Sequence, residues 1–323
     1  MADVKIGFIG TGGIANAHAG VLSQLPDVKI IACTDVDEKK GNEFASKYSA
    51  KFLKDYKALL DIKEIDAVYI CTPPYLHKEQ VIDTAKAKKH IFCEKPITLN
   101  LADADEIAKV IKSAGVKLMV GYILHFYPAC KTLKDIFESG KLGSLLTCWS
   151  NRLGYFNTAK KWISDPSKSG GMTVEFFTHD LDWLKWVGGE VLSVYGKVWR
   201  VHPDTQTEDN IWTILTFKTG VGVGGASWAS PLGNTTMGVI GTKGGAIMLD
   251  WTKIKVKENN GEEKIIEVEP TGVAMVNEDK HFIECIKSGK DPINNIVDAR
   301  EVLRIALAVQ QSSRENKVIQ LGA

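Results

Sequence analysis

The sequence predicts two domains: an α/β domain with a parallel sheet over residues 1–121, and an α+β domain with a large, mainly antiparallel sheet over residues 122–323. In the first part, short apolar runs alternate with amphipathic helical stretches, which is typical of β-α units. In the second part, longer segments alternate between polar and apolar residues, as antiparallel strands with one solvated face do. A chain of 323 residues is long enough for two hydrophobic cores.

The apolar runs of the first part predict buried strands, because most of them are apolar at successive positions, as in strands covered on both faces. We expect these strands at residues 4–9, 29–34, 51–53, 67–71, 90–93 and 117–120. A helix is predicted after the first strand, where apolar residues recur at helical spacing: Ile14, Ala17, Val21, Leu22 and Leu25. Residues 101–111 repeat this helical pattern before Gly115. The alternation predicts a Rossmann-like fold for residues 1–121.

The second part predicts a sheet of long strands that look antiparallel. The alternating segments are 145–153, 191–201, 211–217, 221–228, 237–240 and 254–257. Residues 218–220 and 258–261 contain the Gly or Asn that hairpin loops need for positive φ. A helical connection through about residue 139 precedes this sheet, and a helix over 297–312 follows it.

Composition excludes several classes of partner. The formal net charge is +1, without the basic excess that binding to a nucleic-acid backbone requires. The chain starts with Met1-Ala2-Asp3 and enters a strand directly, and we read neither a signal peptide nor a membrane span. Six cysteines are scattered without a C-x-x-C pair, which favours a reducing compartment. We therefore expect a cytoplasmic protein that binds neither nucleic acid nor membranes.

The segment Gly10-Thr11-Gly12-Gly13-Ile14-Ala15 matches a dinucleotide-binding loop, because it follows a strand and opens a helix. Gly10 allows the tight turn, Gly12 allows the backbone to approach a pyrophosphate, and Ala15 allows the helix to pack closely on the strand. The amides at the start of the helix favour an anion. We expect Thr11, Gly13 and Ile14 to contact the coenzyme with these residues.

Asp35 ends the second predicted strand, where an acidic side chain accepts hydrogen bonds from the adenosine ribose. This position favours NAD, because a 2′-phosphate would be repelled by Asp35 and by nearby Asp37. Lys39 and Lys40 could offset that repulsion, so NADP stays an alternative. Asp35 could at the same time be the N-cap of the next helix.

Two polar constellations follow. Glu94-Lys95-Pro96 comes directly after a predicted strand, so its lysine lies at the strand end where coenzyme and substrate bind in α/β sheets. Further on, Glu175 and His179 are four residues apart and would share one face of a helix. From spacing alone, a structural histidine or a surface contact is the more common explanation of such a pair than a site. No third ligand is placed by the sequence, so we predict no metal site.

Together these motifs resemble the glucose-fructose oxidoreductase, inositol dehydrogenase and rhizopine catabolism (Gfo/Idh/MocA) family of NAD(P)-dependent oxidoreductases. The resemblance spans the whole chain and includes Asp182, Pro292 and Asp298-Ala299. It implies that Thr72, Pro73 and His77 line the nicotinamide-side ribose, that Glu94 and Lys95 contact the coenzyme, and that the Lys95-Pro96 bond is cis. Two departures are Glu175, where inositol dehydrogenases usually have aspartate, and His125-Phe126, where many members have arginine before an aromatic residue.

The resemblance implies a mechanism in which a secondary alcohol loses a hydride to the coenzyme and a proton to a base. We assign the base to His179, whose ordinary pKa lies near working pH. Lys95 would stabilise the reacting oxygen, and Glu175 would orient His179 or bind a neighbouring hydroxyl. Tyr122 and His125 are predicted substrate contacts. Trp162 lies in a segment that resembles the loop covering the site in the family. The alternative is that Trp162 is a buried aromatic residue.

The predicted function is therefore an NAD(P)-dependent dehydrogenase acting on a secondary hydroxyl of a sugar, inositol or related polyol. Two alternatives are a redox-cycling NAD-dependent glycosidase and a non-enzymatic dinucleotide sensor; a sensor would have no chemical need for Lys95 or His179. A homo-oligomer, dimer or tetramer, is predicted from tryptophans on the strands of the second domain, although core burial would explain them as well: Trp149, Trp199, Trp212 and Trp228.

Overall fold

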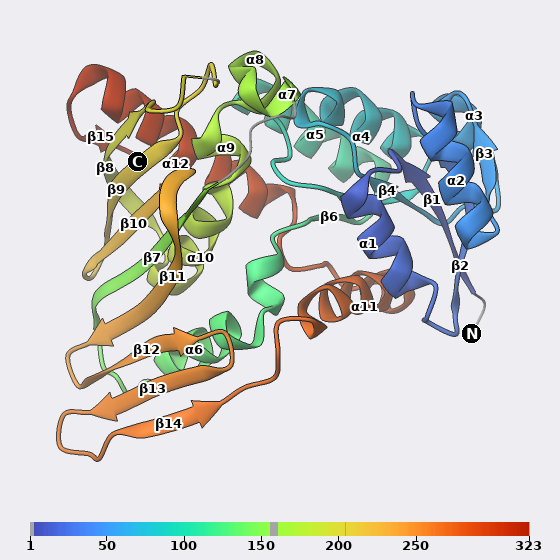
Figure 1. Ribbon diagram of the computed structural model, residues 1–323. Helices are drawn as coiled ribbons and strands as arrows, with labels where there is room; N and C mark the ends of the chain where they lie inside the picture. Colours follow the sequence, from blue (N-terminus) through green and yellow to red (C-terminus); the bar gives the residue numbers. More distant parts are fainter. Residues whose placement is uncertain (1–2, 156–160, 204, 323) are drawn as a thin grey trace. The chain divides into compact units, whose positions relative to one another are not determined.

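The computed structural model describes residues 3–155, 161–203 and 205–322 (Figure 1). The chain forms two compact units. Unit 1 contains Met1–Tyr122 and Met275–Arg300, and unit 2 contains Ile123–Ala274 and Glu301–Ala323. The sequence prediction assigned every residue after 121 to the second domain, whereas in the structure residues 275–300 return to the first unit. The difference arises because a late helix packs on the early strands, which no local pattern reveals.

Unit 1 is built on a six-stranded parallel sheet with the strand order β3-β2-β1-β4-β5-β6. The strands are β1 (Val4–Ile9), β2 (Val28–Thr34), β3 (Lys51–Leu53), β4 (Ala67–Ile70), β5 (His90–Cys93) and β6 (Leu118–Val120). All six lie within one residue of their predicted bounds, and the predicted α/β fold class is confirmed. The strand order reverses between β1 and β4, which places a topological switch point at their carboxyl ends.

The helices of unit 1 surround this sheet in Figure 1. They are α1 (Gly13–Leu22), α2 (Glu38–Tyr48), α3 (Tyr56–Leu60), η1 (Pro74–Leu76), α4 (His77–Lys86), α5 (Leu101–Ala114) and α11 (Val273–Ser288). Asn100 caps α5 by accepting a hydrogen bond from the amide of Asp103, and Gly115 ends it with φ 67°. A buried aromatic stack of Phe8, Tyr69 and Phe92 fills the core, with Phe282 of α11 against its edge.

Helix α1 buries a different face from the predicted one. Its buried residues are Ala15, His18, Ala19 and Leu22. Ile14, which was expected to contact the coenzyme, is 39% exposed. The pattern was wrong here because the core contains a polar residue, His18, whose partners come from distant parts of the chain.

Unit 2 is built on a nine-stranded sheet with the order β14-β13-β12-β11-β7-β10-β9-β8-β15. Its strands are β7 (Leu145–Tyr155), β8 (Val191–Trp199), β9 (Asn210–Phe217), β10 (Val221–Ser227), β11 (Ala229–Gly241), β12 (Gly244–Asp250), β13 (Lys253–Glu258), β14 (Lys264–Glu267) and β15 (Ile319–Gln320). The mainly antiparallel sheet is confirmed. One pair, β7 with β10, is parallel, in contrast to the antiparallel appearance of the segments.

Strands β12, β14 and β15 and helix α11 were not predicted. Strand β12 begins with two glycines, β14 is polar and largely exposed, β15 has two residues, and α11 mixes charged and apolar residues. Of the two predicted hairpin turns, the first has Gly220 at φ 74° as expected. The second turn, over 258–261, forms without a positive φ.

The helices of unit 2 are η2 (Ile123–Phe126), α6 (Pro128–Glu138), α7 (Lys161–Ser164), α8 (Pro166–Ser169), α9 (Met172–Glu175), α10 (Thr178–Gly188) and α12 (Ile296–Glu315), of which α12 begins in unit 1. Helix α6 packs on β11, β12 and β13, and α10 packs on β7 and β10. Figure 1 shows α10 against β7 and β10. Side chains exposed by 38–46% lie on β8 and β9 and belong to Tyr195, Trp199, Trp212 and Ile214. Trp228, by contrast, is buried. Among the described residues, no helix is both long and apolar enough to span a membrane.

Candidate functional site

The glycine-rich loop joins β1 to α1 and has the shape of a dinucleotide cradle. Gly10 has φ 89°, and a Cβ there would lie 2.8 Å from the carbonyl oxygen of Cys71, so only glycine fits. A Cβ on Gly12 or Gly13 would meet nothing within 4 Å, so the outer side of the loop is open to a ligand. The glycine N-cap Gly12 has no side-chain oxygen for the first amides of α1, which leaves them for an anion.

Asp35 lies directly after β2 and is tied to this loop. Its Oδ2 accepts hydrogen bonds from the amide and the hydroxyl of Thr11, at 2.7 and 2.9 Å. Its Oδ1 accepts from the amide of Asp37 at 2.8 Å. The N-cap of α2 is Asp37, which accepts from the amide of Lys40 and forms an ion pair with its side chain. The alternative that Asp35 caps this helix is therefore wrong. Its carboxylate orders the loop, and Oδ1, which accepts a single hydrogen bond, keeps a lone pair for a ribose.

His77 holds two predicted coenzyme loops together. Its Nδ1 lies 2.8 Å from the carbonyl oxygen of Pro96, and its Nε2 lies 2.8 Å from that of Thr72. The ring is fully buried, and burial lowers its pKa, although the two carbonyl contacts oppose that shift. The Thr72 hydroxyl donates to Gln80 at 2.5 Å. This geometry favours a positioning role for His77 over the direct coenzyme contact that the resemblance implied, while Thr72 and Pro73 are half-buried.

Glu94-Lys95-Pro96 follows β5, at the same carboxyl edge as the glycine loop, and its Lys95-Pro96 bond is cis as expected. The Oε2 of Glu94 accepts a hydrogen bond from the amide of Lys95 at 3.2 Å, and its Oε1 lies 3.2 Å from Nε2 of His18. Burial by itself would raise the pKa of Glu94, but His18 and Lys95 outweigh it and lower that pKa below its ordinary value. Glu94 is thus an ionised carboxylate that contacts the backbone of the predicted catalytic lysine.

Glu175 and His179 do not share one helix. Glu175 ends α9, and His179 lies in the first turn of α10. Between them, the amides of Phe176 and Phe177 both donate to the carbonyl of Met172, so the regular helical pattern is interrupted. The prediction of one continuous helix was therefore wrong. Both side chains are half-buried.

Two buried pairs fix α10 and with it His179. Arg152 of β7 donates to both carboxylate oxygens of Asp180, with Nε to Oδ1 at 3.0 Å and Nη2 to Oδ2 at 2.6 Å. Burial raises the pKa of Asp180 even though Arg152 and Ser150 oppose that shift. Two residues further along α10, Oδ2 of Asp182 lies 2.7 Å from Nε2 of His125. His125, predicted as a substrate contact, is 8% exposed and stacked on a tryptophan.

The double-glycine turn before α9 is held by Glu208. This carboxylate accepts hydrogen bonds from the amide and hydroxyl of Thr173, at 3.1 and 2.7 Å. Gln310 of α12 donates both to Glu208 and to the carbonyl of Gly170. A Cβ on Gly171, at φ 86°, would lie 2.5 Å from Glu208, so this approach needs glycine. The contacts of Glu208 and Gln310 thus fix the position at which α9 begins.

The remaining predicted contacts differ in exposure. Trp162 lies in α7 and is half-buried, whereas Tyr122 is fully buried and its carbonyl accepts from Asn294. Sequence reasoning missed His18, Arg152 and Glu208. The one indication for His18 was a histidine among the apolar positions of α1. Arg152 and Glu208 lie in segments that carry no recognisable motif. Among the described residues, no group of three His, Cys, Asp or Glu side chains could hold a metal ion.

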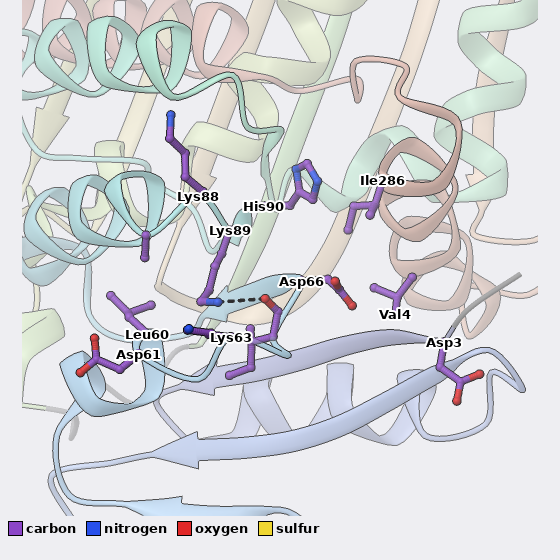
Figure 2. A pocket seen from close by; sticks show the side chains of 12 residues that line it. Asp3, Val4, Leu60, Asp61, Lys63, Asp66, Lys88, Lys89, His90 and Ile286 are labelled. Carbon is purple, nitrogen blue, oxygen red and sulfur yellow. Dashed lines mark hydrogen bonds between the residues drawn. The ribbon is translucent and has the colours of Figure 1, made fainter.

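A pocket of about 640 Å³ in unit 1 lies away from these residues (Figure 2). Its lining includes Val4 and His90, which begin β1 and β5, so it opens at the amino ends of the strands. The Lys89 ammonium at its edge donates to the carbonyls of Ile62 and Ile65 at 2.8 and 3.0 Å. Ligands of doubly wound sheets bind at the opposite edge, where the glycine loop and Lys95 lie.

Comparison with known proteins agrees with this geometry. Residues 4–122 match a family model described as an oxidoreductase family with an NAD-binding Rossmann fold, and residues 130–247 match the GFO/IDH/MocA C-terminal domain. The myo-inositol 2-dehydrogenase of Thermotoga maritima is 30% identical over 333 residues, covering 98% of both chains. The 2,7-anhydro-N-acetylneuraminate hydratase of Escherichia coli is 31% identical over 224 residues, which cover 67% of this chain and 59% of that protein.

Solved structures show the same fold. A levoglucosan dehydrogenase in complex with NADH and levoglucosan superposes with a TM-score of 0.93, covering 99% of this chain and all of the other at 20% identity. At that identity the likeness concerns the fold alone.

Proposed function

Because this chain belongs to the GFO/IDH/MocA family of oxidoreductases, with an NAD-binding Rossmann domain, we propose that it transfers a hydride between NAD and a secondary hydroxyl of a sugar, inositol or related polyol. The observation that supports this most is the open glycine cradle ordered by Asp35, on the same sheet edge as Lys95. The relative of matching length acts on myo-inositol, a cyclic polyol, according to its name.

The residues that would hold the coenzyme come from unit 1. The amides around Gly12 and Gly13 would meet the pyrophosphate, Asp35 the adenosine ribose, and the Thr72-Pro73 and Glu94-Lys95 segments the nicotinamide side. Ile14, exposed at the first turn of α1, would be covered by the coenzyme. When bound, NAD supplies a hydride acceptor or donor at C4 of its nicotinamide.

The chain's own groups would handle the proton and the charge. In the oxidative direction, a ring nitrogen of His179 takes the hydroxyl proton while the carbon-bound hydrogen leaves as hydride, and a carbonyl forms. The Lys95 ammonium stabilises negative charge on the reacting oxygen, and Glu175 supports His179 or binds an adjacent hydroxyl.

A second candidate function is suggested by the hydratase relative, whose reaction class differs from a simple dehydrogenase. A redox-cycling enzyme oxidises a hydroxyl, eliminates a neighbouring group and returns the hydride, so it retains NAD without net reduction. We keep the dehydrogenase as the leading proposal because the match to the inositol enzyme spans both chains. We also propose that the exposed aromatic face of β8 and β9 joins copies of this chain into a homo-oligomer.

The test is a substrate panel of inositols, hexoses, aldonates and glycosides with NAD or NADP, followed by absorbance of the reduced coenzyme and by product analysis. Net reduction with an inositol or sugar supports the dehydrogenase. Product formation from a glycoside or anhydrosugar without net reduction would support the cycling enzyme. Absence of both would contradict the proposal.

A further inference from the structure

His18 is a fully buried histidine clamped between two carboxylates of unit 1. Its Nδ1 lies 2.8 Å from Oδ1 of Asp279, and its Nε2 lies 3.2 Å from Oε1 of Glu94. An imidazole can donate from both nitrogens only when it is protonated, and both partners here are acceptors when ionised. The geometry therefore favours an imidazolium. Burial would lower the pKa of His18, but Asp279 and Glu94 together raise it well above the ordinary value.

His18, Glu94 and Asp279 form a buried cluster, and the groups around this cluster are acidic or weakly polar. The Tyr69 hydroxyl donates to Oδ1 of Asp279 at 3.1 Å. Glu278 is buried beside these residues. Oε1 of Glu278 and Oδ2 of Asp279 are both buried without a hydrogen-bond partner. The thiols of Cys71 and Cys93 are also buried near these carboxylates. His18 is thus the cation that Glu94 and Asp279 share.

The cluster reaches the predicted catalytic lysine through one carboxylate. Glu94 has one oxygen toward His18 and the other at the amide of Lys95, so the imidazolium fixes the rotation of the group that holds the Lys95 backbone. We propose that His18 and Asp279 are positioning residues that orient Glu94, and through Glu94 the ammonium of Lys95, for the reaction. This inference rests on the proposed role of Lys95.

Removing the cation would disturb this arrangement. Without His18, Glu94 and Asp279 would be two carboxylates in one buried site with no charge between them, and breaking a buried ion pair by deleting one partner leaves an uncompensated charge. Glu94 would then take up a proton or rotate toward solvent, where its side chain is already 14% exposed. Rotation breaks the contact to the amide of Lys95, and protonation weakens it, because a neutral carboxyl group is a poorer acceptor than a carboxylate.

The experiment compares His18→Gln with Lys95→Ala and the double variant in the full-length chain, on the substrate that the panel identifies. His18→Gln should lower kcat roughly 10- to 100-fold, the scale of a small misplacement of a catalytic group. The dissociation constant of NAD, measured by calorimetry, should change by less than about threefold, because a misplaced lysine affects the transition state more than binding. In the Lys95→Ala background, His18→Gln should cause no further loss, because residues that act as one unit are not additive.

Two further variants keep the inference testable. Tyr69→Phe removes a hydrogen bond from the same cluster and leaves its charges, so kcat should stay within about threefold of the native value. Glu94→Gln removes the carboxylate charge with little change of shape, and should reproduce the loss of His18→Gln without adding to it. It replaces His18→Gln if thermal unfolding shows that variant to be misfolded.

The outcomes distinguish the proposed role of Lys95 from the proposed positioning by His18. If Lys95→Ala keeps full turnover, the proposed role of Lys95 fails and this inference with it. If Lys95→Ala is impaired but the His18→Gln loss adds to it in full, Lys95 is supported and positioning by His18 is refuted. A folded His18→Gln protein with native kcat would also overturn the inference.

Discussion

Asp35 accepts hydrogen bonds from both the amide and the hydroxyl of Thr11, at 2.7 and 2.9 Å, so the residue expected to select the coenzyme also orders the loop that binds it. Removing its side chain therefore has two separable effects. Loss of loop order weakens any dinucleotide, whereas loss of the carboxylate removes a ribose acceptor and the repulsion of a 2′-phosphate.

Asp35→Ala should consequently weaken NAD more than NADP, measured as dissociation constants by calorimetry. Thr11→Val is the matched control, because it loosens the loop and keeps the carboxylate, and it should weaken both coenzymes by similar factors. Native protein that binds NADP about tenfold more tightly than NAD, a difference of about 1.4 kcal/mol, would contradict the coenzyme assignment.

Lys95→Ala and His179→Ala should each lower turnover by roughly two to four orders of magnitude, the usual contribution of positioned acid-base or electrostatic groups, with NAD affinity nearly unchanged. Glu175→Gln should cost less, because the amide keeps a hydrogen bond. Steady-state kinetics on the true substrate measure this. Full turnover by the His179→Ala protein without added base would exclude the proposed proton transfer.

The buried Glu278 predicts a pH dependence of stability for unit 1. Burial raises the pKa of Glu278 well above its ordinary value. Above about pH 4.5 the unfolded chain gives up this proton while the folded chain keeps it, so the free energy of unfolding falls as pH rises, until the raised pKa is passed. His18 acts in the same direction, because its stabilising charge is lost as pH rises through its own raised pKa.

Glu278→Gln should therefore raise the unfolding temperature at pH 8 and change it little at pH 4.5, measured by scanning calorimetry. Each kcal/mol corresponds to about 2–4 °C for a domain of this size class. Glu284→Gln, at an exposed position on the same helix, is the control and should leave the curve unchanged. An equal shift at both pH values would show that Glu278 acts through packing and not through its proton.

Arg152→Met should destabilise unit 2, because it leaves Asp180 buried without its cation. The expected loss at pH 7 is about 3–5 kcal/mol, the usual cost of removing one partner of a buried pair. The loss should shrink on acidification, since Asp180 becomes neutral as pH falls through its raised pKa. Chemical denaturation at pH 7 and pH 5 tests both points; a loss that is independent of pH would indicate that packing alone is responsible.

Trp212→Asp should dissociate the proposed oligomer, because Trp212 lies on the exposed aromatic face of β9 and is 43% exposed. Light scattering at micromolar concentration should give a multiple of the 35.5 kDa chain mass for the native protein and a smaller mass for the variant. Val297→Asp, at an apolar position 70% exposed elsewhere, should keep the native mass. A monomeric native protein would rule out the assembly.

The parts of this molecule that sequence predicts well are those encoded locally. The six parallel strands and the loop at Gly10 were predictable because each pattern lies within a few consecutive residues. The partners of His18 were not, since Asp279 is 261 residues away in the chain. The interruption between Glu175 and His179 was hidden for a related reason: nothing in the spacing of four residues distinguishes one helix from two short ones joined at Phe176.

Because residues 275–300 belong to unit 1, part of its core is translated only after most of unit 2. The first 122 residues emerge from the ribosome early, yet the buried faces of Tyr69 and Phe92 lack Phe282, and His18 lacks Asp279, until α11 has been made. Domains usually fold as units as they emerge. Here the core of unit 1 lacks these contacts until the chain up to residue 274 and then α11 have been translated. A nascent chain stalled before α11 should therefore be more protease-sensitive in its first 122 residues than one released after residue 300.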